Sequence, residues 1–111
     1  MTTYQVDGWT ALGDPRRREI FERLVERPRT VAELTGELPI SQPAISQHLK
    51  VLREADLVGF RPDGARRVYR VKPEGIAALR ADLDRFWAST LANFKQLADA
   101  EAAQRKDNDH D

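Results

Sequence analysis

The sequence predicts a mainly α-helical fold that carries one small two-stranded β-sheet, and three observations predict it. An amphipathic segment from Ser41 to Arg53 repeats apolar residues at i, i+4 and i+7, which is typical of a helix with one buried face. A turn signal at Asp63-Gly64 lies between two short segments of strand-like composition. An apolar repeat close to the helical period runs through most of 74–103. Together they indicate a helical domain, a hairpin and a long last helix.

Length and composition bound the architecture. The 111 residues suggest one domain over 1–103, followed by a polar tail over 104–111 that we expect to be disordered. An apolar content of 41% is enough for a modest core, and no apolar run approaches the roughly 20 residues that span a bilayer. The first residues lack the basic-then-apolar pattern of a signal peptide, and the absence of cysteine excludes disulfides and thiolate metal sites. We therefore expect a cytoplasmic protein.

Charge is distributed unevenly along a chain whose net charge is zero. Residues 41–72 contain seven Lys or Arg against three acids, whereas 82–111 contain four bases against seven acids. A basic middle with an acidic end is what a surface facing nucleic acid would produce. Solvated charge without a partner is the alternative.

Two helices are expected before residue 30. A short one over about 7–13 has Asp7 as its N-cap and Gly13 as its stop at the C′ position. A second begins at Asp14-Pro15 and should end near Arg27, because the following proline disfavours helical backbone in the residue before it. The second helix should bury a stripe made of Ile20, Phe21, Leu24 and Val25.

The next two helices form a predicted helix-turn-helix. Thr30 and Glu33 are spaced as a capping box at the start of a brief helix over 31–38. Ser41 can cap the following helix, and Pro43 fits its first turn. The second helix would enter the major groove, where Gln, Ser and Lys bind base edges and phosphates. We expect phosphate positioning from Ser41 and Lys50 and base reading from Gln42, Ser46, Gln47 and His48. An ordinary amphipathic helix is the alternative.

Residues 57–71 predict a β-hairpin with arginines near its tip. A strand over 57–60 leads to the turn, and a second strand covers 66–71. As a wing beside the helix pair, the hairpin would place Arg61, Arg66 and Arg67 against the DNA backbone or a neighbouring minor groove. Arg70 lies farther from the tip, and the sequence does not decide whether it contacts DNA. The alternative for the whole segment is a surface hairpin that binds no DNA.

The last helix, over about 74–103, carries more apolar surface than a small domain can cover. An exposed stripe of this size predicts a partner, most simply the same helix of a second copy. The alternative is that the helix folds back on its own domain. The expected interface residues on this helix are Leu79, Leu83, Phe86, Trp87, Leu91 and Phe94.

In its order of elements the chain resembles the ArsR family of winged helix-turn-helix repressors, from about Trp9 to Leu97. Three segments carry the resemblance: 11–20, 41–57 and 64–71. The resemblance implies a homodimeric, autoregulating transcription factor that binds an operator with two half-sites. It also implies that the first helix joins the last in the dimer interface, which adds Trp9 and Leu12 to the expected residues.

The chain departs from the metal-sensing members of that family. Thr30-Val31-Ala32 stands where those members often carry Cys-x-Cys, and the only histidines are His48 and His110. Zinc-like metals need thiolate or imidazole ligands, so we expect no metal and no other cofactor. An effector pocket lined by Trp9, Trp87 and Phe94 at the dimer seam is an alternative to simple packing of these aromatic residues.

Other function classes have less support from the sequence. Ser46 and His48 are two residues apart on a helix and point in different directions, so they do not form a nucleophile–base pair, and we expect no catalysis. A winged-helix module that binds an acidic protein through its basic hairpin is the competing class.

Overall fold

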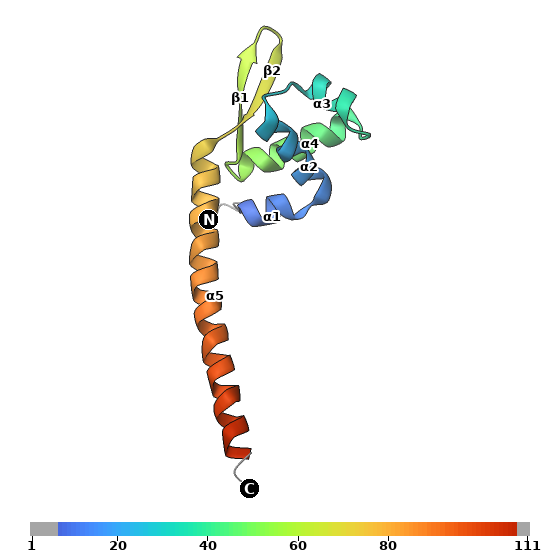
Figure 1. Ribbon diagram of the computed structural model, residues 1–111. Coiled ribbons are helices and arrows are strands. Elements are labelled where there is room, and N and C mark those ends of the chain that lie inside the picture. The colour runs from blue at the N-terminus through green and yellow to red at the C-terminus, as the bar shows by residue number, and fades with distance from the viewer. Residues whose placement is uncertain (1–6, 109–111) are drawn as a thin grey trace, which may run out of the picture. The chain divides into compact units, whose positions relative to one another are not determined.

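The computed structural model describes residues 7–108 and divides the chain into two compact units, 1–79 and 80–111, each described here by itself (Figure 1). Residues 1–6 and 109–111, which include His110 and most of the segment tested for a signal peptide, lie outside the described part. The elements are α1 (Gly8–Gly13), α2 (Pro15–Glu26), α3 (Val31–Glu37), α4 (Gln42–Glu54), β1 (Val58–Asp63), β2 (Arg66–Val71) and α5 (Pro73–Asn108).

The core of the first unit is built around α4. This helix packs against α1, α2, α3 and β1, and Ile45, Leu49 and Leu52 on its inner face are each 0% exposed. Ile20 of α2 and Leu34 of α3 join them in the same cluster. The apolar face predicted for this segment is therefore confirmed.

A tight chain reversal ends α4 and leads into the wing. Asp56 adopts a left-handed backbone (φ 62°), and the Leu57 N–H donates to the Leu52 carbonyl at 3.0 Å, which is the pattern of a Schellman cap. Lys72 Nζ lies 2.5 Å from Asp56 Oδ1. A Cβ at position 75 would lie 1.9 Å from the Asp56 carbonyl oxygen, so only Gly75 permits this approach.

The wing is an antiparallel pair whose register runs from Val58↔Val71 to Asp63↔Arg66. Its loop is Gly64–Ala65, with positive φ at Gly64 only (62°), as in a type II′ turn. The predicted turn was one residue too early, because the first strand continues through Pro62 to Asp63. Proline is tolerated there because both strands of a two-stranded ribbon are edges.

Two predictions about α1 and α2 are wrong. Gly13 is the last residue of α1 and not a left-handed stop, because Asp14 serves at once as the C-cap of α1 and the N-cap of α2. Val25 is 60% exposed: the buried stripe of α2 is Ile20 and Leu24, and Val25 is rotated by about 100° from Leu24. The expected start and end of α2 are confirmed.

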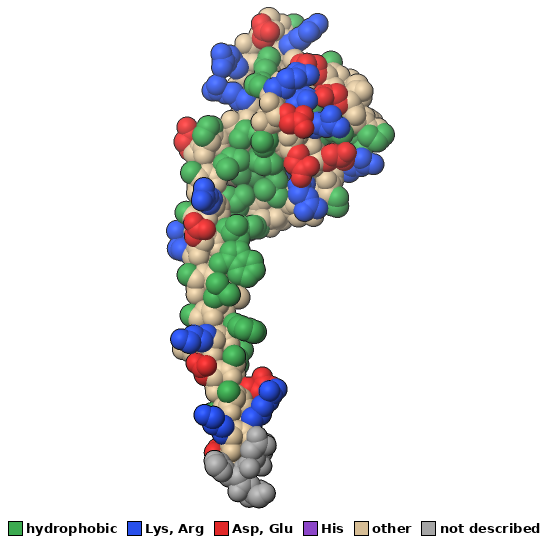
Figure 2. Space-filling view, viewed as in Figure 1, with side chains coloured by type: hydrophobic (Ala, Val, Ile, Leu, Met, Phe, Trp, Pro, Cys, Tyr) green, Lys and Arg blue, Asp and Glu red, His purple; other side chains and the backbone are tan. Residues whose placement is uncertain are grey.

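The second unit consists of the helical residues from Arg80 onward. The helix continues past the predicted end at 103 to Asn108, so 104–108 is helical where we expected disorder. Apart from the half-buried Leu83, its large apolar side chains are exposed, from 49% for Trp87 to 70% for Leu97, and hydrophobic side chains follow this helix in Figure 2. Among the described residues no helix is long and apolar enough to cross a membrane.

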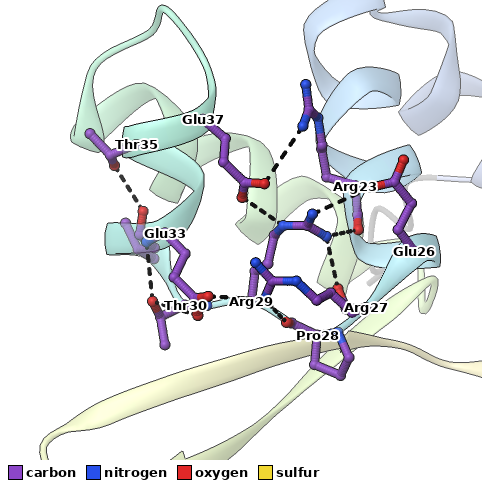
Figure 3. Close-up of polar contacts among 10 residues, drawn as sticks. Arg23, Glu26, Arg27, Pro28, Arg29, Thr30, Glu33, Thr35 and Glu37 are labelled. Carbon is purple, nitrogen blue, oxygen red and sulfur yellow. Dashed lines mark hydrogen bonds and ion pairs between the residues drawn. The ribbon is translucent and has the colours of Figure 1, made fainter.

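Arg29, between α2 and α3, is a buried charge that joins three elements of the first unit. Its backbone N–H donates to the Tyr69 carbonyl at 3.0 Å and its carbonyl accepts from the Tyr69 N–H at 2.8 Å, which ties the linker to β2. Its guanidinium donates to Glu37 at 2.6 Å, to Glu26 at 3.4 Å and to the Arg23 carbonyl (Figure 3). A buried guanidinium needs such partners, because an unpaired one would be very costly. The contacts therefore fix α2, α3 and β2 to one another.

This arrangement predicts a pH-dependent contribution from Glu37. Its hydrogen bond with Arg29 lowers the pKa of the Glu37 carboxyl. Its contribution to stability is therefore present above the ordinary carboxyl pKa of about 4.3 and is lost as pH falls through the lowered pKa. We expect Glu37→Gln to lower the Tm at neutral pH, with the difference from wild type shrinking in acid. Thermal unfolding followed by circular dichroism measures both.

Glu19→Gln is the matched control for Glu37→Gln. It removes an exposed ion pair with Arg16, and such pairs contribute little. A Glu37→Gln protein whose Tm at neutral pH equals that of the control would contradict the role given to the buried pair.

Candidate nucleic-acid interface

The outward side of α4 brings most of the predicted recognition residues together. Gln42, Ser46 and Lys50 follow one another at i, i+4 and i+8, so they form a row along the helix surface, and all three are exposed. Gln47 is exposed beside this row. Ser41 is exposed at the N-cap, where its hydroxyl accepts the Ala44 N–H at 3.3 Å. Amide, hydroxyl and ammonium groups are thus presented together by a helix whose opposite side is locked in the core.

His48 lies on another side of α4. Its ring is half-buried, and Nδ1 is buried without a hydrogen-bond partner within residues 7–108. His48 is two residues from Ser46 and from Lys50, so it does not share the row that Gln42, Ser46 and Lys50 form along the helix. Its expected base-reading role stays a prediction.

The wing meets the start of α4 in an open groove of about 560 Å³. Arg66 and Arg67 line this groove together with Gln42 and Thr30. Arg61, in contrast, lines a different groove of about 370 Å³, and Arg70 accompanies it there. Of the three predicted wing residues, the structure thus brings Arg66 and Arg67 to the recognition helix and separates Arg61 from them.

The C-terminal half of α4 and β1 border another groove, of about 440 Å³. Lys50, Arg53, Phe60 and Lys72 are among the residues that line it. Arg53 was not among the predicted site residues, although its position three residues after Lys50 places it on the same side of the helix. That spacing was the signal that could have identified it.

Within the described chain carboxylates pair with four of the six arginines of α2 and its linker, all except Arg17 and Arg18, but with none of the basic residues of α4 and the wing. Arg23 pairs with Glu37 at 3.6 Å and Arg27 with Glu33 at 2.9 Å. Figure 2 shows acidic and basic side chains intermixed over part of the first unit, and basic ones on the wing. Within residues 7–108 six cations have no carboxylate partner on the α4–wing surface: Lys50, Arg53, Arg61, Arg66, Arg67 and Arg70.

The helix α3 braces α4 from the other side of the helix-turn-helix. The predicted capping box is present: Thr30 Oγ1 accepts the Glu33 N–H at 3.2 Å, and Glu33 Oε1 accepts the Thr30 N–H at 3.0 Å. The Thr30 N–H is the main cause of a lowered pKa of the Glu33 carboxyl, with Arg27 as a further cause. The first turn of α3 is thus held by a capping box whose carboxylate, Glu33, is ionised at neutral pH.

The expected dimer residues are placed in two different ways. In the first unit Trp9 is 46% exposed, whereas Leu12 and Leu79 pack half-buried against the core. In the second unit Leu83 is half-buried and the other expected residues, Phe86, Trp87, Leu91 and Phe94, are exposed. The rings of Phe86 and Trp87 meet edge to face, with centroids 5.3 Å apart.

This arrangement has the chemistry that double-stranded DNA requires. Unpaired cations favour phosphate contacts, and a helix that presents amide and hydroxyl groups can read base edges in the major groove. Candidate metal ligands do not gather in the same way: the described residues contain no group of three or more His, Asp or Glu side chains placed to hold an ion.

Comparison with known proteins gives the same answer. The bacterial regulatory protein arsR family matches residues 14–59, from the start of α2 into β1. The HTH-type transcriptional regulator Rv2034 of Mycobacterium tuberculosis is 54% identical over 91% of this chain and 96% of its own length. The HTH-type transcriptional repressor SmtB of the same species is 38% identical over 65% of this chain and 53% of its own length.

A solved structure described as a possible transcriptional regulator for arsenical resistance superimposes with a TM-score of 0.67 and is 42% identical. It covers 78% of this chain and 95% of that one. These likenesses confirm the predicted winged helix-turn-helix fold and the prediction that the protein is a regulator and not an enzyme. The chain therefore belongs to the ArsR family of DNA-binding transcriptional regulators.

Proposed function

We propose that the protein is a homodimeric repressor that binds a two-half-site operator, including one upstream of its own gene, and that metals do not regulate it. The observation that carries the proposal is the row Gln42, Ser46 and Lys50, exposed on α4 beside wing arginines that have no carboxylate partner in the described chain. Occupying a promoter through this surface would exclude polymerase.

The proposed contacts follow from the position and chemistry of each side chain. Gln42, Ser46 and Gln47 read base edges, and His48, which lies off the row, contributes a further base contact. Ser41 and Lys50 position the helix against phosphates. On the wing, Arg66 and Arg67 hold the DNA backbone beside the major groove that α4 enters, and Arg61 contacts the backbone from the separate groove that it lines.

The repressor and homodimer parts of the proposal have separate support. A relative of this chain is named a transcriptional repressor. The exposed apolar residues from Phe86 to Leu97 on α5 are a surface that a second copy can cover, with Trp9, Leu12, Leu79 and Leu83 contributing to the same interface. A two-fold dimer would present two recognition helices to two half-sites.

The proposed absence of metal control rests on ligand chemistry. The chain has no cysteine, and Thr30, Val31 and Ala32 occupy the start of α3. These side chains offer no thiolate or imidazole to a zinc-like ion. An effector, if the repressor uses one, would accordingly be recognised by apolar and aromatic contacts, for which Trp9, Trp87 and Phe94 are the candidates.

Gln47→Ala tests base reading. We expect it to weaken binding by about 1–3 kcal/mol and to relax preference at one operator position, because a bidentate amide contact to a base is lost. Fluorescence anisotropy with a duplex from upstream of the gene, varied one base pair at a time, measures this. Arg66→Ala is the matched contrast and should weaken all duplexes alike. An unchanged preference profile for Gln47→Ala would refute the role of Gln47.

Leu91→Glu tests the dimer. Leu91 is 60% exposed, and a carboxylate in an apolar interface would be desolvated without a partner. We expect wild type to sediment as a dimer, and Leu91→Glu to sediment as a monomer with much weaker operator binding. Gln96→Glu, which adds the same charge away from the apolar stripe, is the control and should stay dimeric. A monomeric wild type, or a dimeric Leu91→Glu, would rule out this interface.

A further inference from the structure

We infer that Phe60 is a positioning residue for DNA binding: its ring holds Arg53 of the recognition helix and Arg67 of the wing as one paired phosphate contact. Arg53 thereby becomes a DNA-contacting residue. The inference deepens the proposed function and rests on its claim that this surface binds DNA.

The geometry brings both guanidinium groups to one aromatic ring. The Arg53 Cζ lies 4.6 Å from the Phe60 ring centroid, and the Arg67 Cζ lies 4.4 Å from it. Arg67 reaches the ring because Phe60 pairs with Tyr69 and Pro62 with Arg67, so Arg67 is a diagonal neighbour on the same face of the ribbon. Arg53 approaches from the last turn of α4. Phe60 thus brings one guanidinium of the helix and one of the wing to the same ring.

The electrostatics of this cluster call for an anionic partner. Two like charges near one ring repel each other, and the negative face of the ring offsets only part of that repulsion. Neither guanidinium has a carboxylate partner within residues 7–108, and the groove at Arg53 and Phe60 is lined by three cations, Lys50, Arg53 and Lys72, against one carboxylate, Glu54. A phosphate between helix and wing would supply the missing charge, and planar guanidinium groups bind phosphate well.

The row on α4 points to duplex DNA as the source of that phosphate. Gln42, Ser46, Lys50 and Arg53 follow at spacings of three or four residues, so Arg53 continues the predicted recognition row toward its C-terminal end. At that end of the helix the wing contributes the next cation, Arg67, which lies over the Phe60 ring. A duplex lying along the row would therefore meet helix and wing cations in sequence.

A phosphate contact of this kind is independent of base sequence, so the experiment uses a random-sequence duplex beside the upstream duplex. We expect Phe60→Leu to weaken binding to both about fivefold, because the ring–cation contacts are lost while an apolar side chain remains. The slope of log affinity against log salt should become shallower by about one, as the paired arginines neutralise phosphate less effectively. Phe60→Trp should restore affinity and slope, whereas a purely structural role for Phe60 would leave the slope unchanged.

Double-mutant cycles locate the effect. Arg53→Ala and Arg67→Ala should each weaken binding less in the Phe60→Leu background than in wild type, since their positioning is already lost. Arg70→Ala, an exposed arginine of the same ribbon that is not stacked on Phe60, should have equal effects in both backgrounds. Equal effects of Arg53→Ala in both backgrounds would overturn the inference.

The possible failures can be told apart. Wild-type affinity and salt slope in Phe60→Leu would overturn this inference alone. If the wild type binds the upstream and random-sequence duplexes equally well and with the same salt dependence, the proposed function alone is overturned. If it binds no duplex, both the proposed function and this inference are overturned. If Phe60→Leu lowers the Tm, Arg53→Lys decides instead: it keeps the charge but not the planar stack, so weaker binding supports the inference and unchanged binding overturns it.

Discussion

The guanidinium of Arg29 lies in the interior of the first unit, only 4% of the residue being exposed, and its charge must be met there by Glu37 and Glu26. Because these carboxylates come from α3 and α2, and because the Arg29 backbone pairs with Tyr69 of β2, three elements cannot shift independently. The wing is therefore held at a fixed place beside the helix-turn-helix. A wing tethered only by its own hairpin would not keep its arginines beside α4.

Local chemistry made much of this fold predictable. Ser41 and Thr30 predicted the starts of α4 and α3 correctly, because a capping hydroxyl or a capping box involves only residues within one turn of the helix. The buried face of α4 followed from its period, and its exposed polar residues followed from the same period. The hairpin was predictable because Gly64 permits the positive φ that its turn requires.

The remaining features depend on contacts between residues distant in sequence. In the sequence Arg29 is one of several charged residues and follows a proline. The residues next to it give no indication that it is buried against Glu37 and β2. Val25 was expected in the core because the apolar repeat of α2 predicts which side of the helix is buried but not how wide the buried stripe is. The pairing of Arg53 and Arg67 with Phe60 needs the helix and the wing to be brought together first, so only the folded chain reveals it.

The central claim is that the outward side of α4 and the wing act as one DNA-binding surface, although the protein as a whole is electrically neutral. Mapping amide hydrogen exchange with and without duplex DNA tests it most directly, because it reports contact along the whole chain at once. The account predicts slowed exchange at 41–50 and at 61–67, with α2 unchanged. Protection confined to α2 or to the C-terminal helix, with none on α4, would contradict it.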